Sequence, residues 1–365
     1  MRADFRVQLQ EMVATVYTLD RELGGGGMAR VFVATEMTLD RKVVIKVLPP
    51  EVAAGVKVER FKREIQFLAK LTHPHIVPLL AAGGNGTLFY YVMPFVQGES
   101  LRTRIVERGE LPVGQVIRTL REVASALAFA HGEGIVHRDI KPDNVLLSGG
   151  SAMVTDFGVA KALSVSTGDG DPNALTSLGI ALGTPSYIAP EQATADPGMD
   201  HRADLYSLGA MGYEMLTGRV PFTARSPQAM LAAHISEHPV PVIQRRSGIP
   251  PLLNALIMSC LEKSPDRRPQ RALEVIDQLD AIVAPRDDGT ASIPATTQAA
   301  ASPASRPLPR SGTRASVDSI YKRVLMIAGA LVIIAMGYFG ARWLIVRNNS
   351  KPADSQFPTS PPTTK

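Results

Sequence analysis

The sequence is poor in cysteine, with Cys260 alone among its 365 residues. One cysteine can form neither an internal disulfide nor a cysteine-based zinc site, and this favours a folded domain in a reducing compartment. Aromatic residues are also few, but 45% of the residues are hydrophobic and 20% are charged. These fractions exclude a wholly disordered chain, a collagen-like repeat and a disulfide scaffold. One large domain with appended segments, or two small domains, fit the length.

The sequence has no apolar signal segment at its start and no excess of basic residues over residues 1–284. The first twenty residues contain no apolar run of seven or more, so we expect no secretory signal and an N-terminus that stays inside the cell. Residues 285–365 hold 10 Lys+Arg and 4 Asp+Glu, while residues 1–284 hold 29 and 30. Because the larger part has no basic excess, we expect no nucleic-acid partner.

The basic excess of the C-terminal part flanks an apolar run. Residues 324–341 are uncharged, and apolar residues resume after Arg342, so that 324–346 is long enough to cross a hydrocarbon core of about 30 Å. We predict one transmembrane helix here, with a buried core helix as the alternative. In residues 285–319, 22 of 35 residues are Ala, Ser, Thr or Pro, which predicts a disordered juxtamembrane linker.

Basic residues on the domain side of this run predict its orientation. Lys322 and Arg323 directly precede the apolar segment, and Arg306, Arg310 and Arg314 lie in the linker before them. The positive-inside rule then places the large domain in the cytoplasm of a single-pass plasma (inner) membrane protein. Residues 348–365 are expected to form a short external tail without a folded sensor domain.

A glycine-rich loop is predicted near the start of the large domain. Residues 17–23 have strand character and lead into Gly24, Gly25, Gly26 and Gly27, after which another apolar strand follows. Glycines allow backbone N–H groups to approach phosphate oxygens closely. On this segment alone, a flexible hairpin turn remains the alternative.

A lysine ends the next predicted strand. Lys46 follows a β-branched run, where a lysine is costly to bury unless an anion meets it. Residues 61–68 have a helical pattern that places Glu64 beside the apolar face. We therefore expect an ion pair between Lys46 and Glu64, with two unrelated surface charges as the alternative.

The chain changes from strand-like to helical character after residues 88–94, which marks a boundary between two lobes. Two polar clusters follow, residues 137–144 and residues 154–158. Asn144 and Asp156 offer the hard oxygen ligands that Mg²⁺ prefers. Asp139 and Lys141 remain free to handle a hydroxyl group and a phosphoryl oxygen.

Taken in this order, the motifs resemble those of bacterial, membrane-anchored, eukaryotic-type serine/threonine protein kinases. The resemblance covers residues 17–279 and leaves residues 1–16 as an N-terminal extension. It implies an α+β, two-lobed fold, with a small β-rich lobe over 17–94 and a larger helical lobe over 99–279. It also implies ATP and Mg²⁺ as cofactors, with Mn²⁺ as a substitute, and protein Ser/Thr hydroxyls as substrates.

The resemblance assigns roles to individual residues. Asp139 would accept the substrate hydroxyl proton, Lys141 would stabilise the transferred phosphoryl group, and Lys46 would hold the α- and β-phosphates. Glu64 would pair with Lys46, Thr184 would brace the catalytic loop, and Asn144 and Asp156 would bind the metal. Residues implied around the nucleotide are Leu23, Gly24, Gly25, Gly26, Gly27, Val31, Val44, Lys46, Met93, Pro94, Val96 and Leu146. The sequence departs from the family pattern at Ala29, where the third glycine is expected, and at Val44, where alanine is usual.

Structural and regulatory roles are implied in the same way. Glu191 would form a buried ion pair with Arg268, and Asp204 would bond the backbone of the catalytic loop. Arg138, which precedes Asp139, is the kind of arginine that a phosphate in the activation segment neutralises. Thr176 and Ser177 are the implied phosphorylation sites.

Two functions remain in comparison. The first is a membrane-anchored signalling enzyme that phosphorylates protein Ser/Thr residues, its own activation segment included. The second is a pseudokinase that acts as a membrane-tethered scaffold. The presence of Lys46, Asp139, Asn144 and Asp156 favours the enzyme, because a scaffold needs none of these costly groups. The small residues Gly337 and Ala341 would also permit a homodimer through the membrane helix.

Overall fold

The computed structural model describes residues 2–26, 29–48, 63, 65–85, 88–157 and 185–283. All of them belong to the first of two compact units, residues 1–288. No helix in these ranges is both long enough and apolar enough to cross a bilayer. The segments predicted as linker, transmembrane helix and external tail lie outside the described residues.

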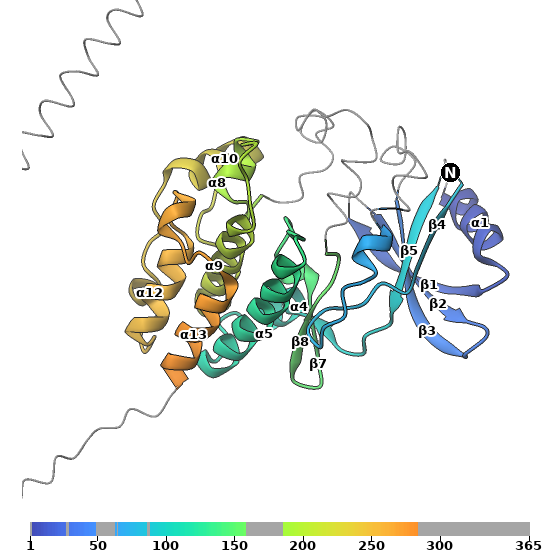
Figure 1. Cartoon of the computed structure of the whole chain (residues 1–365), viewed down its shortest axis with the longest axis horizontal. Helices are drawn as coiled ribbons and strands as arrows, with labels where there is room; N and C mark the ends of the chain where they lie inside the picture. The colour runs from blue at the N-terminus through green and yellow to red at the C-terminus, as the bar shows by residue number, and fades with distance from the viewer. Residues whose placement is uncertain are drawn as a thin grey trace, which may run out of the picture. The chain divides into compact units, whose positions relative to one another are not determined.

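The small lobe is built on a five-stranded antiparallel sheet in the order β1-β2-β3-β5-β4 (Figure 1). The strands are β1 Tyr17–Gly26, β2 Ala29–Glu36, β3 Arg41–Leu48, β4 Ala81–Gly84 and β5 Phe89–Pro94. Successive side chains of a strand point to opposite faces. Ile45 accordingly packs in one hydrophobic cluster, while its neighbour Val44 packs in another.

Helix α1, Arg2–Val13, covers the Ile45 face of this sheet (Figure 1). Leu9 and Val13 are buried there against the strands. Gln10 ties the helix to β1, because its Nε2 donates to the Tyr17 carbonyl at 3.0 Å and its Oε1 accepts from the Leu19 N–H at 2.7 Å. The N-terminal extension is thus an ordered part of the small lobe.

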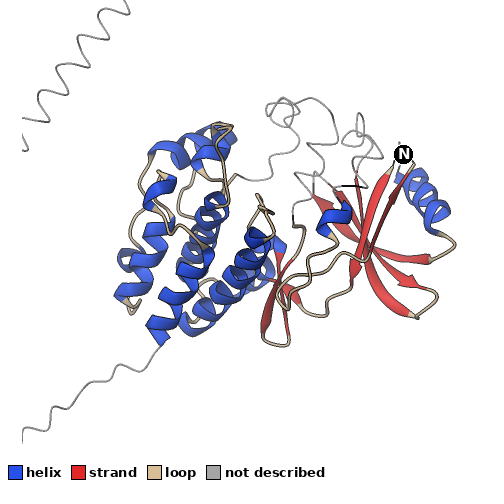
Figure 2. Ribbon diagram, in the orientation of Figure 1, coloured by secondary structure: helices blue, strands red, loops and turns tan. Residues whose placement is uncertain are grey.

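The second lobe is mainly helical (Figure 2). Its helices are α4 Leu101–Arg108, α5 Val113–Gly132, α8 Pro190–Ala193, α9 Arg202–Thr217, α10 Pro227–Ser236, α11 Val242–Arg245, α12 Pro251–Cys260 and α13 Ala272–Val283, with the 3-10 turns η1 Pro142–Asn144 and η2 Pro265–Arg267. A small antiparallel sheet, β6 Glu99–Ser100, β7 Val145–Ser148 and β8 Ser151–Val154, follows the first lobe. The predicted two-lobed α+β architecture is confirmed.

Helix α9 forms the centre of the helical lobe and is buried from Ala203 to Thr217. Two glycines allow the neighbouring helices to approach it closely. A Cβ atom at Gly209 would lie 2.5 Å from Cβ of Cys260, and one at Gly212 would lie 2.5 Å from Cδ1 of Ile257. A larger residue at Gly209 would force α9 and α12 apart, and one at Gly212 would displace the Ile257 side chain. The helix therefore provides a rigid base for the loops that it supports.

Candidate active site

Asp156 lies just beyond β8, where the chain turns back toward the small lobe. Its backbone has φ of +67°, a conformation that costs energy for a residue with a side chain. The end of β8 is fixed by a second segment, because the Val154 N–H donates to the His75 carbonyl at 2.8 Å and its carbonyl accepts from Val77 at 2.9 Å. These bonds direct the Asp156 carboxylate toward the sheet of the small lobe.

Two residues of that sheet bind the carboxylate. Lys46 on β3 forms an ion pair with Oδ2 of Asp156, and the Tyr91 hydroxyl on β5 donates to Oδ1 at 2.9 Å. Burial alone would raise the pKa of Asp156, but the charge and hydrogen bonds of Lys46 and Tyr91 hold it below its ordinary range. Burial raises the pKa of Tyr91 well above its usual value. The carboxylate is therefore anionic and the phenol is a donor at neutral pH.

Asp139, Lys141 and Asn144 form a second cluster on the helical side. The Lys141 Nζ donates to both carboxylate oxygens of Asp139, at 2.7 and 3.0 Å. The Asn144 Nδ2 donates to the Asp139 carbonyl at 2.8 Å and to Oδ2 at 3.0 Å. The Asp139 side chain keeps 42% of its surface exposed. It is positioned by its neighbours and still accessible to a hydroxyl group from outside.

The side chain of Asp204, on α9, hydrogen-bonds the backbone just before Asp139. This fully buried carboxylate accepts from the His137 N–H at 2.8 Å and the Arg138 N–H at 2.7 Å, and His131 Nε2 lies 2.8 Å away. Burial would raise the pKa of Asp204, yet the bonds to His131 and the backbone lower it overall. Arg138 has φ of +69°, so these bonds also stabilise a strained residue next to Asp139.

A buried ion pair supports the segment after residue 184. Arg268 donates to Glu191 through both terminal nitrogens, at 2.6 and 2.8 Å, and both residues are buried. The guanidinium also donates to the carbonyls of Arg202, Glu262 and Lys263, which satisfies its remaining donors. A fully hydrogen-bonded pair of this kind fixes local geometry. It is the pair that the resemblance implied.

Most of the apolar residues expected around a nucleotide lie together in one cluster. Val44 and Met93 are buried, and Val31, Val96 and Leu146 pack against the same core. Leu23 is 45% exposed, at the edge of the β1–β2 hairpin. Gly24 has φ of +112°, which only glycine adopts without strain. This apolar cluster therefore lies on the face of the sheet that carries Lys46, since Val31 is the register partner of Lys46 and Val44 is two residues before it.

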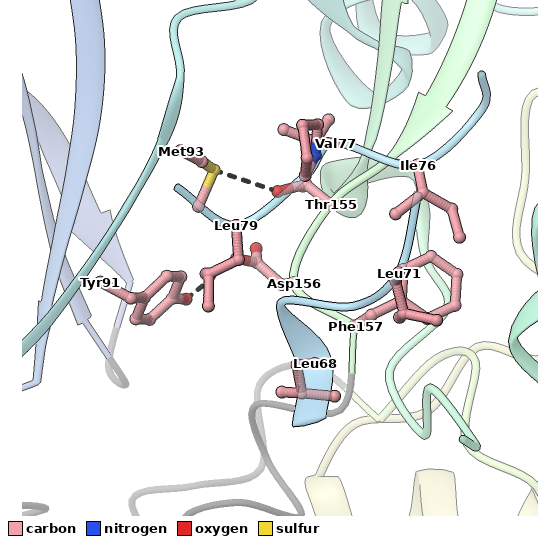
Figure 3. A pocket seen from close by; sticks show the side chains of 11 residues that line it. Leu68, Leu71, Ile76, Val77, Leu79, Tyr91, Met93, Thr155, Asp156 and Phe157 are labelled. Atoms are coloured by element: carbon pink, nitrogen blue, oxygen red, sulfur yellow. Dashed lines mark hydrogen bonds between the residues drawn. The ribbon is translucent and has the colours of Figure 1, made fainter. Parts of the chain in front are cut away.

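A small cavity lies behind Met93, beside Asp156 (Figure 3). Its free space of about 20 Å³ holds about one water molecule. The Thr155 Oγ1 donates to the Met93 sulfur at 3.3 Å, and the Phe157 ring packs edge-on against His137 at 4.6 Å between centroids. Met93 and Asp156 are predicted site residues that line this cavity, whereas sequence reasoning assigned no role to Tyr91, whose hydroxyl donates to Asp156.

Several predicted residues cannot be placed. Gly27, Glu64, Thr176, Ser177 and Thr184 lie outside the described residues. The expected pair between Lys46 and Glu64 therefore stays a prediction.

The donors present fit a magnesium ion that is held jointly with phosphate. Asp156 provides an anionic carboxylate, and Asn144 donates through its amide nitrogen to Asp139, which leaves the amide oxygen as the group that could meet a cation. The described ranges contain no cluster of three or more His, Cys, Asp or Glu residues suited to a metal. Mg²⁺ does not need such a cluster, since it usually binds through one or two protein groups together with substrate phosphates and water.

Comparisons with known proteins agree on one family. The family described as protein kinase domain matches residues 17–279. Serine/threonine-protein kinase PknB of Mycolicibacterium smegmatis is 40% identical over 265 residues, covering 71% of this chain and 41% of that protein. Serine/threonine-protein kinase pkn2 of Myxococcus xanthus is 38% identical over 316 residues, covering 82% and 36%. The chain thus spans less than half the length of these curated relatives.

A solved structure shares the fold. The crystal structure of Rad53 1–466 in complex with AMP-PNP is 25% identical, with a TM-score of 0.59, over 76% of this chain and 69% of that one. A probable serine/threonine-protein kinase of Clostridium acetobutylicum is 39% identical over 274 residues, which cover 73% of this chain and 40% of that protein.

The Asp204 network predicts a particular pH dependence of stability. Because its pKa is lower in the folded than in the unfolded chain, Asp204 contributes stability above its unfolded pKa of about 4, which is lost as the pH falls through the folded value. We expect Asp204→Asn to lower the free energy of unfolding by about 3 kcal/mol at pH 7. The loss should shrink below about pH 4, which urea unfolding followed by circular dichroism would measure.

The exposed Asp277 on α13 offers a matched control, because Asp277→Asn removes a carboxylate from the surface. It should leave both the stability and its pH dependence near wild type. A deficit of Asp204→Asn that stays constant from pH 7 to pH 3 would contradict the assignment.

Proposed function

Because the chain belongs to the protein kinase family, we propose that it is a serine/threonine protein kinase that transfers the γ-phosphate of ATP to protein hydroxyls. One observation carries the proposal: Asp139, Lys141 and Asn144 form a hydrogen-bonded cluster with an accessible carboxylate. The ion pair of Asp156 and Lys46 supplies an anionic group for a metal and a cationic group for phosphate. The relatives named as serine/threonine kinases, and the bound ATP analogue named for Rad53, support the substrate class.

Each of these site residues has its own role in the proposed phosphate transfer. The Asp139 carboxylate accepts the proton of the substrate hydroxyl while that oxygen forms a bond to the γ-phosphorus and the bond to the ADP oxygen breaks. Lys141, already beside Asp139, places its charge on the transferred phosphoryl oxygens. Lys46 would move from Asp156 to the phosphates, and Asn144 and Asp156 would hold the metal. Mg²⁺, which we propose as the metal with Mn²⁺ as a substitute, would neutralise the charge that develops on the phosphate oxygens.

The competing reading is a scaffold without activity. A scaffold would have no need for an accessible carboxylate that two donors orient, nor for a buried anion paired with a lysine. These groups are costly to maintain and are explained together by phosphate transfer.

We expect Asp139→Asn to lower phosphate transfer by about 10²- to 10⁴-fold. The amide keeps the shape of the side chain but cannot accept the proton, so the affinity for ATP and Mg²⁺ should stay nearly unchanged. Transfer of labelled phosphate to a protein substrate and calorimetric nucleotide binding would measure the two effects separately. Asp143→Asn, at an exposed neighbour on η1, is the control and should keep most of the activity. Full turnover in Asp139→Asn would refute the assigned role.

Arg138 supports autophosphorylation of the activation segment. Its Nε is buried and has no hydrogen-bond partner among the described residues. Burial lowers the pKa of this guanidinium, while Asp204 partly offsets the effect. A buried donor without a partner is unfavourable, and a phosphate group on Thr176 or Ser177 would supply charge-assisted acceptors. We propose Thr176 as the first of these sites.

On this basis, Thr176→Ala should lower activity toward an external substrate, because Arg138 would lack its acceptor. Ser164→Ala, in the same segment, is the matched control and should have little effect. Mass spectrometry of the active protein would locate the phosphates. Active protein without phosphate anywhere between residues 157 and 183 would contradict the proposal.

We further propose that the chain is anchored in the cell membrane by residues 324–346, with the kinase domain in the cytoplasm and residues 348–365 outside. The support is the length of the apolar run and the basic residues before it. Gly337 and Ala341 offer small residues for a homodimer within the membrane.

This topology predicts that the full chain sediments with membranes and resists extraction by alkaline carbonate, while a chain ending at Ala284 stays soluble and active. A membrane span keeps the full chain in the bilayer, whereas every kinase motif precedes the cut. External protease should remove the tail only. Release of the full chain by carbonate, or a tail that is cut only from the cytoplasmic side, would overturn it.

A further inference from the structure

Tyr91 is held firmly at the centre of the small-lobe sheet. Its strand β5 lies between β3 and β4, where Tyr91 is the register partner of Lys46 on one side and of Ala82 on the other. The side chain is 3% exposed. With the backbone fixed on both sides and only two side-chain torsions, the hydroxyl has little freedom to move.

Lys46 and Tyr91 share one carboxylate, each binding a different oxygen. As direct cross-strand neighbours, their side chains emerge on the same face of the sheet. Lys46 binds Oδ2 of Asp156, and the Tyr91 hydroxyl donates to Oδ1 at 2.9 Å. Among the described residues, these are the two side chains that hydrogen-bond the carboxylate. The lysine side chain has more rotatable bonds than the tyrosine side chain, so it can move to another partner more easily.

The hydrogen bond from the Tyr91 hydroxyl to Asp156 lies beside a small cavity with a mainly apolar lining. Leu68, Leu79 and Met93 line the cavity next to Tyr91 and Asp156 (Figure 3). The cavity has room for about one water molecule, and the Asp156 side chain keeps only 16% of its surface exposed, so few waters can reach Oδ1. A hydrogen bond to a charged group is stronger in such apolar surroundings than in water.

We propose that Tyr91 is a positioning residue that holds Oδ1 of Asp156, so that the carboxylate keeps its orientation when Lys46 leaves Oδ2 for the nucleotide phosphates. The inference rests on the proposed function, in which Lys46 moves to the phosphates and Asp156 binds the metal. Partners that orient a metal-binding group affect metal affinity by about 10- to 100-fold when they are removed. Tyr91 would therefore set the magnesium requirement of the nucleotide site.

The test uses the full chain and its Tyr91→Phe variant, which keeps the ring and removes only the hydroxyl. Isothermal titration calorimetry with ADP, repeated over a series of Mg²⁺ concentrations, gives the metal affinity of the nucleotide site without any turnover. Mg²⁺ should raise the affinity for ADP in both proteins. We expect the Mg²⁺ concentration that gives half of this increase to be at least about 10-fold higher for the variant than for wild type. Its affinity for ADP without metal should stay near wild type.

Tyr90→Phe is the matched control, because Tyr90 is the next residue on β5 and packs with the cluster under α1 on the opposite face. It should leave the Mg²⁺ dependence unchanged. An unchanged or lowered Mg²⁺ requirement in Tyr91→Phe would overturn the inference, as would an equal loss of ADP affinity with and without metal, which indicates a merely structural role. A wild-type chain that binds no ADP at any Mg²⁺ concentration would overturn the proposed function together with this inference.

Discussion

The bond between the Asp156 carboxylate and two residues of the small-lobe sheet is the constraint on which the site depends. Asp156 follows β8 and has a strained backbone conformation. Its charge is stabilised by Lys46 and Tyr91, which lie on neighbouring strands of the small lobe. An anion in this partly buried place would otherwise be costly. The same contact joins the two lobes and brings Lys46 and Asp156, the residues that we propose bind phosphate and metal, within reach of one ligand.

The carboxylates of the helical lobe are of two kinds: some are buried and fix the structure, and one is accessible. Asp204 and Glu191 are buried, and each is bonded by several donors, so that they fix the loops around them. Asp139 is oriented by Lys141 and Asn144 but remains accessible. Buried, fully paired charges serve as fixed anchors because moving them would leave a charge without a partner. Asp139, the carboxylate that we propose takes part in the reaction, is then accessible to solvent on a rigid base.

Motif order was sufficient to anticipate much of this arrangement. Asp139, Lys141 and Asn144 lie within six residues of one another, so their proximity follows from the local sequence, and the Glu191–Arg268 pair followed from the family resemblance. The bond from Tyr91 to Asp156 was not foreseen, because strand periodicity shows which face a side chain takes and not which residue of the other lobe meets it. Helix α1 was also not foreseen, although Phe5, Leu9 and Met12 recur at helical spacing.

The central claim is that Lys46, Asn144 and Asp156 form one site for a nucleotide and its metal. A crystal structure of the protein with a non-hydrolysable ATP analogue and Mn²⁺ tests it most directly, because the anomalous signal of manganese locates the metal without reference to the protein. The account predicts a peak between the side-chain oxygens of Asn144 and Asp156, with the Lys46 ammonium on the phosphates and the Tyr91 hydroxyl still on Oδ1. A metal bound away from both residues, or phosphates beyond the reach of Lys46, would contradict it.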